Sequence, residues 1–127
     1  MDIALGDRRF GPASRAAVGE AVSRGTLIAC EVVWTELAAI FPTPADATAT
    51  LLALDVAFAP MTQEAAEAAG GLWAEYRRSG GPRTRVVADF LIAGHTCVHA
   101  DALLTRDRGF GRTHFGDLTI IDPSNEG

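Results

Sequence analysis

The sequence predicts an α/β protein in three layers, a parallel β-sheet flanked by α-helices. Short apolar segments alternate along the chain with longer segments that have helical periodicity. The connections between the apolar segments are too long for hairpins, so the strands should run parallel. The 127 residues contain no repeat, low-complexity tract or long linker, which indicates a single domain over residues 1–127.

The first half of the chain contains three predicted helices and one predicted strand. Serine or proline stands at the N-terminal end of two of these helices, and glycine or proline follows the last turn of two. The predicted strand is the short apolar run TLIAC. The helices are expected at Ser14–Arg24, Val32–Phe41 and Pro44–Leu54, and the strand at Thr26–Cys30.

The second half contains two helices and three strands. Thr62 can cap the longer helix, although Gly70 and Gly71 weaken its middle. The run SGGP forms a loop between the two helices. The helices are expected at Thr62–Arg78 and Arg85–Ala100, and the strands at Val56–Pro60, Ala102–Thr105 and Leu118–Ile121.

Composition excludes several classes of protein. No apolar run reaches the roughly 18 residues of a membrane span, and the N-terminus lacks the order of a signal peptide, so we expect a cytoplasmic protein without membrane association. The net charge of −5 does not suit general coating of nucleic acids. Cys30 and Cys97 are isolated and are expected to be buried small hydrophobic residues rather than parts of a disulfide or zinc site.

Asp89 is the only acidic residue in the otherwise mostly apolar run VVADFLIAGHTCV. A helix that is apolar on nearly all faces should be buried. An ionised carboxylate there is costly unless it is paired or bound to a metal. The alternative to a functional role is an ion pair with Arg85 or Arg106.

Glu36 falls within the helical stripe formed by Val33, Leu37 and Ile40. The alternative to a functional role is that Glu36 lies at the edge of the helix with its carboxylate in water. Glu31 lies on another face near the helix start, where it suits the macrodipole, and is expected to be a cap or surface residue.

Asp107 follows a predicted strand, where ligands bind in parallel sheets, but aspartates after strands also form turns. Together, Glu36, Asp89 and Asp107 come from three segments near one expected sheet edge. Such close carboxylates repel, and a divalent cation relieves the repulsion. Magnesium prefers these oxygen ligands.

Other motifs are less informative. His95 falls within the predicted buried helix and is expected to be a satisfied core histidine, whereas His99 and His114 are expected at the surface. No HExxH motif occurs, so zinc is not expected, and a Walker A loop is impossible because the chain contains no lysine.

Three segments of the chain carry a recognisable pattern: TELAAIF, VVADFLIAGH and ALLTRDRGFGRTHFGDLTIIDP. The second contains D-x-L-I-A-G-H at Asp89–His95, and the third contains L-L-T-R-D-x-x-F at Leu103–Phe110. In this order and spacing they resemble PIN-domain ribonucleases, and more narrowly the VapC-type toxins of toxin–antitoxin pairs. The match runs in order over about Leu27 to Pro123.

The resemblance implies a Mg²⁺- or Mn²⁺-dependent endoribonuclease, often a homodimer, whose site is blocked by a small VapB-type antitoxin. By position, Glu36, Asp89 and Asp107 match the family's acidic residues. Thr105 matches the hydroxyl residue before the last of these acids, and Gly109 stands where some members have a further acid. Thr105 is a candidate for substrate binding, and so are four arginines that can hold the RNA backbone: Arg83, Arg85, Arg106 and Arg108. The alternative for these arginines is ion pairing with the acids or a position on the solvated surface.

The N-terminus departs from the family pattern. Family members usually open with a strand that ends in a metal-ligating aspartate. Here Asp2 aligns with a later, non-catalytic aspartate of that pattern, so the first strand is expected to be missing or shortened. The alternative function is therefore a catalytically impaired PIN-fold binding module, and a less favoured third is a small α/β protein that binds a phosphate-bearing metabolite.

Overall fold

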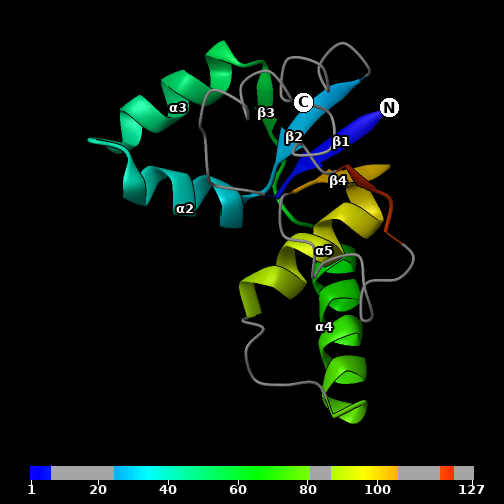
Figure 1. Cartoon of the computed structure of the whole chain (residues 1–127). Helices are drawn as coiled ribbons and strands as arrows, with labels where there is room; N and C mark the ends of the chain where they lie inside the picture. Colours follow the sequence, from blue (N-terminus) through cyan, green and yellow to red (C-terminus); the bar gives the residue numbers. More distant parts are fainter. Residues whose placement is uncertain (7–24, 81–86, 106–117, 122–127) are drawn as a thin grey trace.

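The computed structural model describes residues 1–6, 25–80, 87–105 and 118–121. These residues contain a five-stranded sheet in the order β3-β2-β1-β4-β5, in which every neighbouring pair is parallel (Figure 1). The sheet confirms the predicted fold class. Its strands are β1 (Asp2–Leu5), β2 (Thr26–Ala29), β3 (Val56–Phe58), β4 (Ala102–Leu104) and β5 (Ile120–Ile121).

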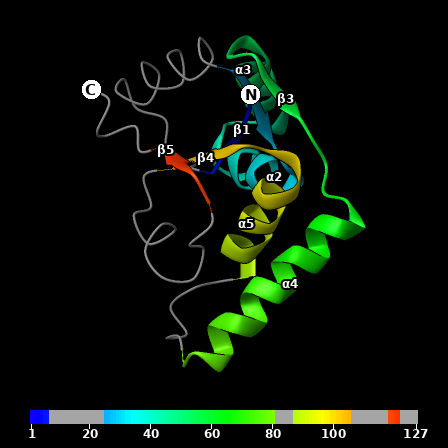
Figure 2. The same ribbon diagram turned by 90° about the vertical axis from the view of Figure 1, so that its right-hand side faces the viewer.

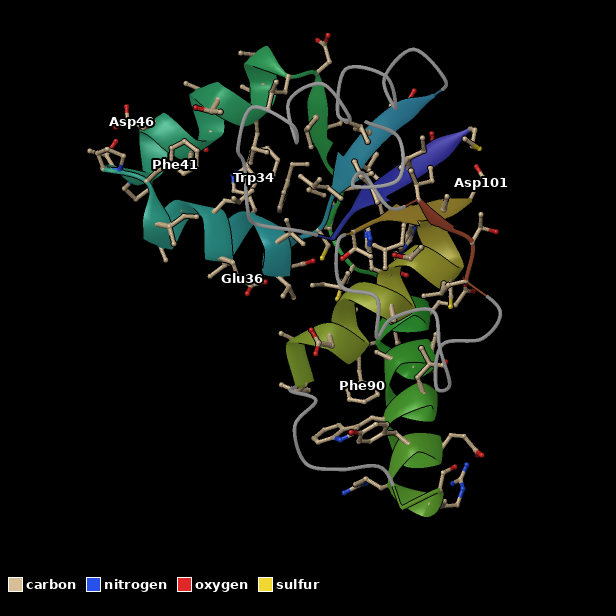
Figure 3. All side chains as sticks on the ribbon, viewed as in Figure 1. Trp34, Glu36, Phe41, Asp46, Phe90 and Asp101 are labelled. Atoms are coloured by element: carbon tan, nitrogen blue, oxygen red, sulfur yellow. The ribbon has the colours of Figure 1, made fainter. Side chains whose placement is uncertain are left out.

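Two helical pairs pack with this sheet. Helices α2 (Glu31–Ile40) and α3 (Pro44–Ala53) form a hairpin, which Trp34 Nε1 closes by donating to Thr48 Oγ1 at 3.1 Å (Figure 3). Helix α5 (Val87–His99) contacts β1, β4 and α2. Helix α4 (Gln63–Arg78) packs along α5 as an outer layer, as Figure 2 shows.

The core lies in the central strands. Ile3–Leu5, Leu27–Ala29 and Ala102–Leu104 are buried without interruption. Continuous burial, rather than alternation, is typical of a parallel sheet covered on both faces. Phe90 of α5 is also fully buried and contacts the rings of Tyr76 and Trp73 from α4, with centroids 5.2 and 6.2 Å away.

The predicted elements in the described ranges are confirmed to within two residues at each boundary. Thr62 caps α4 by accepting from the Ala65 N–H at 3.2 Å, as its sequence position predicted. Thr43 caps α3 in the same way at Asp46, with Pro44 in the first turn. The expected helix Ser14–Arg24 lies outside the described residues. None of the described helices is long and apolar enough to cross a membrane.

The first strand is expected to be missing or shortened, and the structure shows that it is not missing. Strand β1 occupies the centre of the sheet, with β2 on one side and β4 on the other, and is as long as β2. The Gly6 N–H continues its ladder by donating to the Leu104 carbonyl at 2.9 Å. The short run Ile3–Leu5 is apolar enough to fill a buried strand.

Candidate functional site

The carboxyl ends of the parallel strands define one edge of the sheet, and Asp89 lies toward this edge. Helix α5 ends at His99, and β4 begins three residues later, so α5 runs antiparallel to β4. Its first turn, which contains Asp89, therefore lies toward the edge where β1, β2 and β4 end. Asp89 is half-buried, between the exposed Val87 and the buried Phe90.

Glu36 reaches the same region from another helix. Helix α2 begins at Glu31, two residues after β2 ends, and thus starts at the carboxyl edge of the sheet. Glu36 is half-buried beside the fully buried Leu37, and leaves α2 on the side away from α3 (Figure 3). Helices α2 and α5 are in contact, so two acidic residues come from neighbouring helices at one end of the sheet.

The remaining predicted site residues are placed only in part. Thr105 directly follows β4, is 1% exposed, and donates its N–H to the Ile121 carbonyl at 3.0 Å. Asp107, Arg85 and Arg106 lie outside the described residues, together with Arg83 and Arg108. Within the described ranges no group of three or more His, Cys, Asp or Glu residues could hold a metal. The role of each predicted site residue stays a prediction.

Strand β1 contributes no carboxylate at its carboxyl end in the described part of the chain, where Leu5 and Gly6 stand. Its one acidic residue, Asp2, lies at the opposite end. There the Asp2 N–H donates to Asp101 Oδ2 at 2.8 Å, and the Asp2 carbonyl accepts from the Asp101 N–H at 2.7 Å. Asp2 therefore supports the amino edge of the sheet and does not join Glu36 and Asp89.

Glu31 has a contact that the sequence did not reveal. It lies in the first turn of α2 as predicted, but it also binds the segment after β3. Its two carboxylate oxygens accept from the Met61 N–H at 2.9 and 3.2 Å. The partners are 30 residues apart in sequence, and no local pattern marks this contact.

His95 is a satisfied core histidine, as predicted. It is 1% exposed, and its Nε2 lies 2.8 Å from the Ala59 carbonyl oxygen. Burial lowers its pKa below the usual value, an effect that His99 reinforces and that Ala59 and Glu31 oppose.

Two further expectations concern α5. His99 is only partly buried, and its contact with Thr62 is exposed, in line with the surface position expected; its Nε2 lies 3.0 Å from Thr62 Oγ1 and its ring 4.9 Å from the His95 ring. Cys97 is exposed, which contradicts the expectation that it is buried. Cys30 is buried as expected, and burial raises its thiol pKa. His114 lies outside the described residues.

Comparison with known families identifies the fold. Residues 3–116 match the family model of the PIN domain. The chain belongs to the PIN domain family. A comparison with curated protein sequences gave no match.

Solved structures of the same fold come from VapBC assemblies. A chain of VapBC-1 from nontypeable Haemophilus influenzae is 18% identical, with a TM-score of 0.72 and coverage of 98% of this chain and 99% of that one. DNA-bound VapBC from Salmonella typhimurium gives 21% identity, a TM-score of 0.69, and coverage of 97% and 98%. VapBC2 from Rickettsia felis, bound to a promoter DNA fragment, gives 17% identity, a TM-score of 0.68, and coverage of 96% and 98%. At these identities the likeness concerns the fold.

Proposed function

We propose that the protein is a metal-dependent endoribonuclease, the toxin of a type II toxin–antitoxin pair, that acts in the cytoplasm. The observation that carries this proposal is the placement of Glu36 and Asp89. These two half-buried carboxylates stand on neighbouring helices at the carboxyl end of a PIN-family sheet. Ligands bind at such sheet edges in open α/β folds.

The donor set fits Mg²⁺ or Mn²⁺. Carboxylate oxygens suit hard divalent cations, and magnesium commonly takes one or two protein carboxylates together with water and substrate phosphate oxygens. Glu36 and Asp89 would hold the ion, with Asp107 as the proposed third ligand. His95 and His99 of α5 have the i, i+4 spacing of zinc ligands, but their Nε2 atoms lie 2.8 Å from the Ala59 carbonyl oxygen and 3.0 Å from Thr62 Oγ1 instead.

The proposed role of each residue follows from the chemistry of its side chain. A bound divalent cation lowers the pKa of water and neutralises charge on a phosphodiester. Glu36 and Asp89 supply the negative charge that retains the cation beside the RNA. Arg85 and Arg106 would hold backbone phosphates through their guanidinium groups, and Thr105 would orient the chain that leads into Asp107.

The partner in this proposal is a small VapB-type antitoxin, and the toxin itself would be a homodimer. An arginine from the antitoxin would pair with Asp89 or Asp107, since a guanidinium can replace the charge of the metal. The VapBC assemblies with the same fold support this class of partner. A structure of the complex in which both acids face solvent would contradict the arginine pairing.

A second candidate is a PIN-fold binding module without catalysis. It is favoured by the last described residues after β1, Leu5 and Gly6, which supply no carboxylate; Asp7 comes next in the sequence and lies outside the described residues. Such a module would bind the antitoxin and leave RNA intact.

The test compares RNA cleavage by the purified chain in Mg²⁺, Mn²⁺ and EDTA. We expect cleavage with either metal, none in EDTA, and a loss of at least about tenfold in Asp89→Asn and Glu36→Gln. Glu67→Gln is the matched control, because Glu67 is exposed on α4, away from the candidate acids, and its carboxylate accepts a hydrogen bond from Gln63 on the same helix. Antitoxin binding without metal-dependent cleavage would favour the binding module.

A further inference from the structure

The segment that follows β3, Ala59–Thr62, lies between the two helices that carry the candidate acids. We name it the β3–α4 connector. Helix α2 holds it through the Glu31 carboxylate, which accepts from the Met61 N–H at 2.9 and 3.2 Å. The Ala59 N–H also donates to the Ala29 carbonyl of β2 at 2.9 Å. The connector is therefore fixed to the start of α2 and to the end of β2.

Helix α5 holds the same connector through its histidines. His95 Nε2 lies 2.8 Å from the Ala59 carbonyl oxygen, and because a carbonyl can only accept, Nε2 carries the proton. His99 Nε2 lies 3.0 Å from Thr62 Oγ1, which also accepts from the Ala65 N–H. The Thr62 hydroxyl can donate to His99 while it accepts from Ala65. Three residues of the connector are thus bound from two helices.

These bonds are hard to replace with apolar packing. The Met61 N–H and the Ala59 carbonyl need partners because an unsatisfied polar backbone group that is shielded from water is destabilising. Glu31 of α2 and His95 of α5 supply these partners. If either side chain is removed, water must replace it as the hydrogen-bond partner of the connector, and the distance between α2 and α5 should change.

We propose that Glu31 and His95 are positioning residues, which set the distance between Glu36 and Asp89 by fixing α2 and α5 to the β3–α4 connector. This inference rests on the proposed metal-dependent activity. Glu31 and Glu36 share one helix, as do Asp89 and His95, so the axial separations are about 7.5 and 9 Å at 1.5 Å per residue. A rigid helix carries a shift at Glu31 or His95 directly to its acid.

The experiment measures the helix separation independently of activity. Nitroxide labels are attached to Ala39→Cys on α2 and to the native, exposed Cys97 on α5, and their distance distribution is measured by pulsed EPR. Cys30 stays unlabelled because it is buried and its thiol pKa is raised. We expect His95→Ala and Glu31→Ala to shift or broaden the distribution. His95→Gln should restore it, since its amide N–H can donate to the Ala59 carbonyl.

The second readout is Mn²⁺ affinity by calorimetry. Loss of a residue that orients metal ligands typically costs 10- to 100-fold in affinity, and we expect that loss in His95→Ala but not in His95→Gln. If the parent chain neither binds Mn²⁺ nor cleaves RNA, the proposed function fails, and the EPR distances alone decide the positioning role.

A folded His95→Ala with an unchanged distance distribution and unchanged Mn²⁺ affinity would overturn the inference. If His95→Ala does not fold, the pair Glu31→Ala and Glu31→Gln is decisive. Glu31→Gln keeps an oxygen acceptor for the Met61 N–H, so only Glu31→Ala should alter both readouts. Identical behaviour of these two variants would also contradict the inference.

Discussion

Replacement of Gly94 by alanine should destabilise the fold through the contact between α4 and α5. A Cβ at position 94 would lie 2.6 Å from the Ala65 carbonyl oxygen, 2.6 Å from the Ala69 amide nitrogen and 2.7 Å from the Ala69 Cβ. Two of these atoms belong to the backbone of α4 and cannot rotate away. The helices must therefore separate by roughly 1 Å to reach the 3.5–4.0 Å of ordinary carbon contacts.

The magnitude follows from two opposing terms. Overpacking in a tight core costs roughly 1–3 kcal/mol, and contacts with backbone place this site at the upper end. Alanine is favoured over glycine within a helix by about 1 kcal/mol. The free energy of unfolding should thus fall by about 1–2 kcal/mol, equivalent to roughly 4–10 °C in Tm for a domain of this size.

The assay is thermal unfolding followed by circular dichroism, with Gly70→Ala as the matched control. Gly70 is also in a helix, and a Cβ there would meet no atom of another element within 4 Å in the described part of the chain, so alanine should raise the Tm slightly. A Gly94→Ala protein with a Tm equal to or above that of the parent chain would refute the close packing of α4 on α5. The result would also remove the physical reason for glycine in the segment Asp89–His95.

Three further predictions concern metal, pH and capping. Magnesium at a hundredfold excess over its Kd should stabilise the folded chain by about 2.7 kcal/mol in thermal unfolding, and Asp89→Asn should abolish the shift. Burial lowers the pKa of His95 in the folded chain. The free energy of unfolding should therefore be highest above about pH 6.5, the pKa of histidine in the unfolded chain. It should fall below that pH, because the unfolded chain then binds a proton that the folded chain excludes. In urea unfolding His95→Gln should flatten this dependence, because glutamine does not bind a proton in this range; an unchanged slope would contradict the assignment to His95. In the same assay, Thr62→Ala should lower the free energy of unfolding by about 1 kcal/mol, because it removes the acceptor for the Ala65 N–H. Thr62→Ser keeps a hydroxyl acceptor and should retain most of the stability of the parent chain.

Much of the fold could be predicted because local chemistry determines it. The short apolar run TLIAC favours a buried strand, which the structure places at Thr26–Ala29, and Thr62 and Pro44 mark helix starts that the structure reproduces. The parallel arrangement followed from connections too long for hairpins, and the described sheet has parallel neighbours throughout. These features depend on residues close together in sequence, so a pattern within one segment is sufficient.

Other features depend on contacts between distant segments. The central place of β1 in the sheet depends on its pairing with β2 and β4, whereas the short run Ile3–Leu5 indicates only that the segment is apolar. The exposure of Cys97 depends on which sides of α5 other elements cover. The bond from Glu31 to the Met61 N–H joins residues 30 positions apart, and neither segment indicates it alone. Sequence periodicity describes one element, whereas these features depend on the relative placement of several.

The two candidate acids share an environment that explains why an acid can stand within an apolar pattern. Glu36 follows the buried Val33 and adjoins the buried Leu37, yet the stripe ends at Ile40, which is 59% exposed. Asp89 likewise stands between an exposed and a buried residue in the first turn of α5. At such a margin the low dielectric of the neighbouring core strengthens the attraction between a carboxylate and a cation, and a cation can still reach the carboxylate from solvent. A fully exposed carboxylate would bind a cation more weakly. The position of both acids at the margin between core and solvent therefore supports their proposed role as metal ligands.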